Sequence, residues 1–187
     1  MLPLRIAPPM SRPLATLVVV MITGFAGFAF GQDHPSMPPG MSHEEHMKQM
    51  RKDAEMKARG NAAMGFDQEK VSHHFRLTRT GGAIEVGVKQ DTDADSRKQI
   101  RDHLQTIARE FADGVFTSPT ATHAEVPPGV AVMRERKARI RYRYEETPDG
   151  ARVVITTADR TARNAVHDFL KYQIREHATG DPLSVQK

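Results

Sequence analysis

Cysteine and tryptophan are both absent from this 187-residue chain. Without cysteine, disulfide bridges and thiolate metal sites are excluded, so a metal ion can be held only by His, Met, Asp or Glu. The sequence also lacks a Gly-rich phosphate loop, a dinucleotide fingerprint, a nucleophile elbow and a paired-carboxylate pattern. These absences favour a non-catalytic protein, although they leave a small enzyme that works through histidines open.

Acidic residues are missing from residues 1–31, where Arg5 and Arg12 precede an apolar run at 14–30. Small residues stand three positions and one position before Gln32, as a cleavage site requires. This pattern is typical of a secretory signal peptide, so we predict a periplasmic or secreted protein of the bacterial envelope. The alternative is a retained anchor, but two glycines interrupt a run that is at the short limit for a membrane span. We therefore expect no stable span after cleavage.

The net charge is also small once the leader is removed. The two leader arginines leave 27 − 2 = 25 basic residues against 23 acidic ones, a net charge of +2. A nearly neutral protein gives no electrostatic argument for nucleic acid, and export argues against it as well. We expect no nucleic-acid partner, and the sequence does not indicate an oligomeric state.

Methionine and histidine are concentrated in residues 32–65, which hold six of the ten methionines and three of the nine histidines. Proline and glycine make residues 33–41 irregular. Ser42 and Glu45 then form a capping box, which predicts a helix from His43 to about Arg59 and a spacer at 60–70. The candidate metal ligands of this segment are His34, Met37, Met41, His43, His46, Met47 and Met50.

This segment has two interpretations. His43, His46, Met47 and Met50 fall on one helical face, so the stripe can pack on the domain or on a partner, since Met is an adaptable apolar residue. Alternatively, thioether and imidazole together suit Cu(I) or silver better than Zn, Ca or Mg. The segment resembles the Met/His-rich tails of envelope copper- and silver-handling proteins. That resemblance implies metal-handling proteins of the envelope as partners.

Residues 66–183 predict an α+β domain built from a duplicated ββα unit, followed by a tail at 184–187. A shift of 66 residues aligns Leu104 with Leu170 and Arg109 with Arg175. We expect a four-stranded, mainly antiparallel sheet with both helices on one face, and a mostly extended linker at 115–137 with a short helix near 130–136. The predicted strands are 73–79, 83–89, 139–145 and 151–157, with turns at 80–82 and 147–150, and the predicted helices are 94–112 and 160–178.

The same region resembles an uncharacterised family of exported bacterial domains. The resemblance implies the domain boundaries and assigns no chemistry. It rests on residues 64–68 (MGFDQ), 73–75 (HHF), 111–114 (FADG), 126–130 (VPPGV), 146–150 (ETPDG) and 167–177 (HDFLKYQIREH).

Three domain histidines, His73, His103 and His177, lie at positions where apolar residues are expected. A histidine at such a position is usually a hydrogen-bonded core residue. The 66-residue shift aligns His103 with Phe169 and Phe111 with His177. If the two helices pack antiparallel, the two histidines meet at one end and the two phenylalanines at the other. His73 can supply a third imidazole, and neutral imidazoles suit Cu or Zn.

The opposite face of the predicted sheet is rich in arginine, which is usual for a solvated antiparallel face. An anion-binding or lipid-facing surface is the alternative. Aromatic residues do not alternate with the basic ones on this face, so the stacking groups of a single-strand nucleic-acid platform are missing. The residues of this face are His74, Arg76, Arg139, Arg141, Arg143 and Arg152.

Taken together, the sequence predicts an exported, non-catalytic protein that binds or buffers a soft metal ion, copper first. A metal-independent interaction module of the envelope is the first alternative, and a small His-dependent or metal-dependent enzyme is the second.

Overall fold

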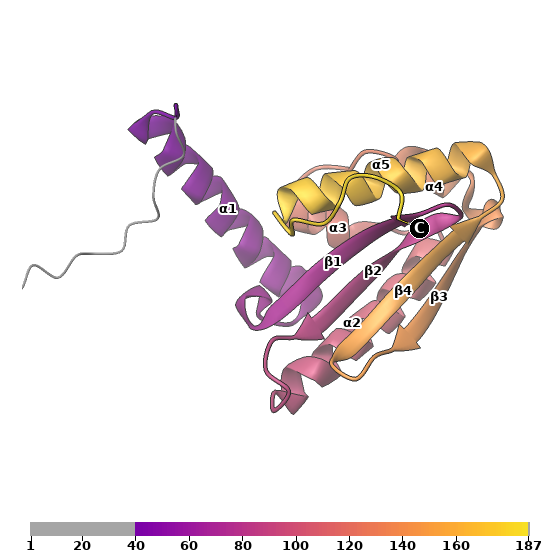
Figure 1. Cartoon of the computed structure of the whole chain (residues 1–187), viewed down its shortest axis with the longest axis horizontal. Coiled ribbons are helices and arrows are strands. Elements are labelled where there is room, and N and C mark those ends of the chain that lie inside the picture. Colours follow the sequence, from indigo (N-terminus) through magenta and orange to yellow (C-terminus); the bar gives the residue numbers. More distant parts are fainter. Residues whose placement is uncertain (1–39, 187) are drawn as a thin grey trace, which may run out of the picture. The chain divides into compact units, whose positions relative to one another are not determined.

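The computed structural model describes residues 40–186. The predicted signal peptide at 1–31 and the candidate ligands His34 and Met37 lie outside this range. The order of elements matches two successive ββα segments preceded by a helix (Figure 1). The elements are α1 (His43–Met64), η1 (Gln68–Lys70), β1 (Val71–Thr78), β2 (Gly81–Val88), α2 (Ala94–Ala112), α3 (Thr117–His123), α4 (Val130–Glu135), η2 (Lys137–Arg139), β3 (Ile140–Glu146), β4 (Gly150–Thr157) and α5 (Arg160–Glu176).

The four strands form one sheet in the order β1-β2-β4-β3, and every neighbouring pair is antiparallel. The second strands of the two hairpins meet at the centre, where Ile84 faces Val153 and Glu85 faces Arg152. The α+β class and the antiparallel sheet are therefore confirmed. The arrangement is one that a duplicated ββα unit would give, and the duplication itself stays a prediction.

Each long helix packs mainly across the hairpin of the other ββα segment. Helix α2 follows β2 but contacts β3 and β4, while α5 follows β4 but contacts β1 and β2. Both helices contribute to one hydrophobic core on the same face of the sheet (Figure 1). Burial of apolar surface is the main stabilising term in folding, so neither ββα segment has a complete core without the other.

Aromatic rings fill the centre of this core. The Phe111 ring lies 5.9 Å from the Phe169 ring in an edge-on arrangement, so the predicted approach of these two residues is confirmed. Phe116, from the segment before α3, adds a third ring 4.4 Å from Phe111. All three side chains are almost fully buried.

The predicted turn at residues 80–82 is wrong, because Gly81 and Gly82 belong to β2 and pair with β4. The hairpin turns instead at Arg79 and Thr80. A Cβ atom on Gly81 would lie 2.2 Å from the carbonyl oxygen of Ile155, and one on Gly82 would lie 2.2 Å from Cδ1 of Leu170. Close approach of β4 and α5, rather than a turn, therefore requires glycine here.

Helix α1 begins as predicted but ends later. Ser42 and Glu45 form the expected capping box. The helix continues to Met64, so the predicted spacer at 60–70 is wrong over its first five residues. Gly60 has low helix propensity, yet it is buried where the side chain of Gln68 packs against the helix. The helix ends at Gly65, whose φ of 77° forms a left-handed cap.

The linker at 115–137 is more helical than predicted. The short helix expected near 130–136 is present as α4, but α3 was not predicted. Its seven residues include Pro119 and three threonines, so its intrinsic propensity is low. Packing against α1 stabilises it instead, and Arg59 of α1 donates a hydrogen bond to the carbonyl of Thr122. Within residues 40–186, none of the helices is both long and apolar enough to cross a membrane.

Candidate functional site

Four histidines from four different elements line one small cavity beneath the sheet. They are His73 of β1, His103 of α2, His123 at the end of α3, and His177, which caps α5. The cavity has a volume of about 60 Å³. Its wall also includes Met64, from the last turn of α1, Gln173 and several apolar residues.

The imidazole rings contact one another and the surrounding aromatic rings. The His177 ring centre lies 5.5 Å from that of His73 and 5.1 Å from that of His123. Phe66 packs edge-on against His103, with 5.6 Å between ring centres. His177 is therefore the central member of the cluster, and its histidine neighbours are His73 and His123.

Burial keeps these imidazoles neutral. It lowers the pKa of His73 and His103 to about 4, and that of His177 to about 3. Positive charge on neighbouring histidines lowers the pKa of His73 and His177 further. Burial also lowers the pKa of His123, partly opposed by its hydrogen bond to Gln173. At neutral pH each ring therefore has one nitrogen with a free lone pair.

Several polar atoms at this cavity have no hydrogen-bond partner among the described residues. They are Nε2 of His73, Nδ1 of His123 and Nε2 of Gln173, and all three are buried. A buried polar group without a partner costs about 1–3 kcal/mol, so such groups usually mark a place where a polar ligand, water or ion binds. Their gathering at one cavity makes it the candidate functional site.

A groove beside α1 is lined by two of the same histidines. His73 and His177 line both the cavity and this groove. The groove also includes Met56 and Asp53 of α1 and Glu176 of α5. His73 and His177 therefore belong to the walls of both hollows.

The three predicted domain ligands, His73, His103 and His177, thus line one cavity. The contacts of His177 are with His73 and His123, however, rather than with His103 as the helix alignment implied. Among residues 40–186, no three His, Asp or Glu side chains already stand where they could hold one metal ion. A site with three imidazole ligands would require at least one ring to turn, and metal binding stays a prediction.

Sequence reasoning counted His123 among the candidate histidines of the domain but gave it no ligand role, and it did not place Gln173 or Met64 in this site. His123 lies in a linker that was predicted to be extended, and Gln173 lies on the buried face of α5 among apolar residues. A buried glutamine on an otherwise apolar helical stripe is the one local signal that could have indicated a polar site. Met64 became part of the site only because α1 extends past Arg59.

The Met/His stripe of α1 lies mostly in solvent. Met47 is 45% exposed and Met50 is 42% exposed. His43 is exposed, while His46 and Met41 are partly buried. Met56, which lies off this stripe, is the methionine of α1 that is buried, with 6% exposure. The stripe therefore does not pack against the domain.

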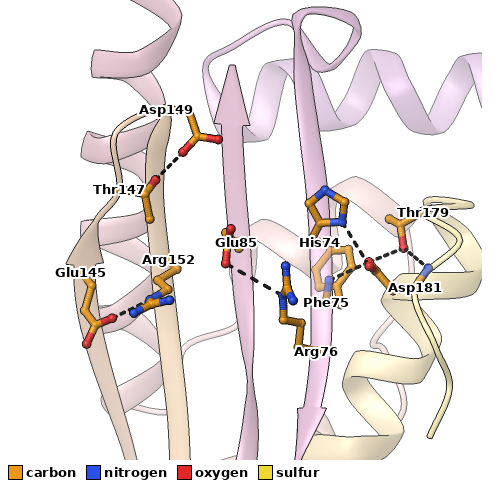
Figure 2. A network of polar contacts seen from close by, with 10 residues as sticks. All are labelled: His74, Phe75, Arg76, Glu85, Glu145, Thr147, Asp149, Arg152, Thr179 and Asp181. Atoms are coloured by element: carbon orange, nitrogen blue, oxygen red, sulfur yellow. Dashed lines mark hydrogen bonds and ion pairs between the residues drawn. The ribbon is translucent and has the colours of Figure 1, made fainter. Parts of the chain in front are cut away.

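On the outer sheet face, three arginines pair with acidic residues, and Figure 2 shows two of these pairs. Arg76 lies 4.0 Å from Glu85, and Arg152 donates to Glu145 over 2.5 Å. Glu145 also pairs with Arg143. On the same face, Asp181 binds the backbone N–H of Phe75 and contacts the ring of His74, which ties the C-terminal segment to β1 (Figure 2). These pairs are what a solvated, charge-balanced face requires.

In comparisons with known proteins, the chain matches no protein-family model, no curated protein and no solved structure.

Proposed function

We propose that this protein is exported to the bacterial envelope and binds a soft metal ion, copper first, without catalysing a reaction. The observation that carries the proposal is a pair of buried imidazole nitrogens at one cavity, Nε2 of His73 and Nδ1 of His123, which have no hydrogen-bond partner among residues 40–186. The resemblance of residues 32–65 to tails of copper- and silver-handling proteins supports the same metal class.

The chemistry of the lining favours Cu(I) over Zn²⁺. The donors at the cavity are neutral imidazoles and the thioether of Met64, and thioethers select soft ions. Structural zinc sites almost always have four protein ligands in a tetrahedron, and no three of the described acidic and histidine side chains converge here. Cu(I) accepts two or three ligands, so one imidazole pair with a thioether is sufficient.

The low pKa values of the cavity histidines favour binding in acid. A metal ion competes with protons for an imidazole of ordinary pKa below about pH 6.5. The pKa of His73 is lowered to about 4 and that of His177 to about 3. Both rings therefore remain available as ligands at pH 5, where an ordinary histidine is mostly protonated.

Competition for Cu(I) against a colorimetric chelator tests the proposal. The purified protein should withdraw Cu(I) from micromolar chelator, and His177→Phe should remove most of that affinity. Phenylalanine stands at the aligned position 111 of the first ββα segment, so we expect the variant to keep the packing. His43→Gln, on the exposed part of α1, is the matched control and should retain the cavity-bound ion. Wild-type protein that fails to compete would overturn the proposal.

A metal-independent interaction module is the second candidate, favoured by the exposed side chains of Met47 and Met50 on one face of α1. Exposed methionines on a helix can pack against a partner because the side chain adapts its shape. Failure of the Cu(I) competition would leave this function as the better supported one.

A further inference from the structure

We propose that His123 is a metal ligand that binds through Nδ1, and that Gln173 is the positioning residue that sets its tautomer. The claim that a metal binds here rests on the proposed function. The claim about the tautomer does not depend on any metal. His123 belongs to no ligand set that the sequence predicted.

The hydrogen bond between the two residues determines where the proton lies. Nε2 of His123 is 3.0 Å from Oε1 of Gln173, and both side chains are buried. In this orientation of the Gln173 amide, the oxygen faces Nε2 and can only accept a hydrogen bond, so we infer that Nε2 carries the proton and donates it. In a neutral imidazole the other nitrogen then carries the lone pair. That nitrogen is Nδ1, the buried atom that has no partner among residues 40–186.

The ring is held on two sides, so its lone pair has a fixed direction. Gln173 is 4% exposed and His123 is 8% exposed. The ring of Tyr172 packs edge-on against His123 at 4.9 Å, and its hydroxyl donates to Glu125 over 2.6 Å. Histidines that bind metals almost always donate their other N–H to an oxygen, which orients the ring and strengthens the ligand. The His123–Gln173 pair already has that arrangement.

His177 is the second ligand that the geometry favours. Its ring centre lies 5.1 Å from that of His123, with the two planes inclined by 78°. Two imidazoles that each bind one ion at about 2 Å have ring centres roughly 5–6 Å apart. The observed separation is compatible with a shared ion, and such a pair does not need the convergence of three side chains. Met64 lines the same cavity and can add a thioether.

Nitrogen-15 NMR of the metal-free wild-type protein is the first test. We expect His123 to be neutral at pH 7, with the proton on Nε2 and with Nδ1 unprotonated. Adding Cu(I) should then shift the Nδ1 resonance. A proton on Nδ1 in the metal-free protein would overturn the inference, whatever the protein does with copper.

Two variants of Gln173 form the second test. Gln173→Leu removes the acceptor at similar volume and should lower Cu(I) affinity by about 10- to 100-fold, the usual effect of losing such a contact. Gln173→Glu keeps an oxygen acceptor and should retain Cu(I) binding and the Nε2–H tautomer. Circular dichroism confirms that both variants fold.

The results separate the inference from the function. Wild-type protein that does not bind Cu(I) would overturn the proposed function, while the tautomer is still decided by NMR. Cu(I) binding that is equal in wild type, His123→Phe and Gln173→Leu would overturn the inference and leave the function standing.

Discussion

Two regions of this protein carry histidine and methionine side chains, and their surroundings differ completely. On α1, Met47 and Met50 point into solvent. Around the cavity, His73, His123 and His177 are enclosed among aromatic rings and have lowered pKa values. Solvated ligands are mobile and can exchange an ion quickly, whereas buried ligands are fixed in number and direction. The comparison teaches that residue type alone does not define a metal site, because burial decides protonation and geometry.

The largest expected difference between the regions is in acid. The pKa of His103 is lowered to about 4 by burial, whereas an unfolded histidine titrates near 6.5. Between these values the unfolded chain binds protons that the folded protein does not, so stability is complete above about pH 6.5 and falls as the pH drops toward 4. At pH 5 one such histidine removes about 2 kcal/mol from the free energy of unfolding.

Urea denaturation at pH 7 and pH 5 measures this loss. The free energy of unfolding of the wild type should fall between pH 7 and pH 5. In the His103→Phe variant this fall should be smaller by about 2 kcal/mol. Equal losses in both proteins would show that His103 is not held neutral, and the contrast between the buried and the exposed region would then disappear.

The two parts of α1 should respond differently to the same substitution. Met56→Ala removes a side chain that is 6% exposed and should destabilise the docking of α1 by about 2 kcal/mol, the lower end for such a change. Met50→Ala removes one that is 42% exposed and should change stability by about 0.5 kcal/mol or less. Hydrogen exchange of the α1 amides measures both. Similar changes in stability for the two variants would mean that α1 is not held to the domain by its buried part.

Methionine-to-leucine changes sharpen the comparison for Cu(I), since they keep volume while removing the soft ligand. The double variant Met47→Leu and Met50→Leu should lose only weak Cu(I) binding on α1 and should keep the tightly bound ion at the cavity. Met64→Leu, at the cavity, should weaken the tightly bound ion instead. Chelator competition gives both affinities, and loss of the tight site in the double variant would move the principal site to α1.

The most local effect concerns the first turn of α1. Ser42→Ala removes the side chain that accepts from the Glu45 backbone and should lower the stability of this turn by about 1 kcal/mol. Ser42→Asp keeps an acceptor and is the control. The effect should be confined to amide exchange near the start of α1, and a change in Cu(I) affinity at the cavity would show that the two regions are coupled.

Local patterns accounted for most of the fold. Alternation along the strands and the apolar stripes of α2 and α5 placed all four strands and both long helices within a few residues. The errors occur where distant contacts decide local structure. Gly81 and Gly82 were assigned to a turn because glycine favours turns, but β4 and α5 require them inside β2. Helix α3 was missed because its contacts with α1 outweigh its low propensity.

The candidate site also combines residues that a local pattern identifies with residues that only distant contacts bring in. His73, His103 and His177 could be named from the sequence because each interrupts an apolar pattern of its own strand or helix. His123 could be counted among the histidines of the domain but not placed with these three, since a seven-residue helix with a proline has no apolar pattern to interrupt. Gln173 could be located on a buried stripe, but its hydrogen bond to a residue 50 positions away is set by how α3 and α5 pack.

The sequence by itself determined the α+β class, the capping box at Ser42 and the supply of soft ligands without thiols. These follow from local periodicity, local hydrogen bonding and composition. Only the tertiary structure decided that four histidines share one cavity, which of them contact His177, and that Met64 rather than Met50 joins them. The physical reason is that burial and ring contacts depend on how α1, α3 and α5 pack together, and no single segment encodes that packing.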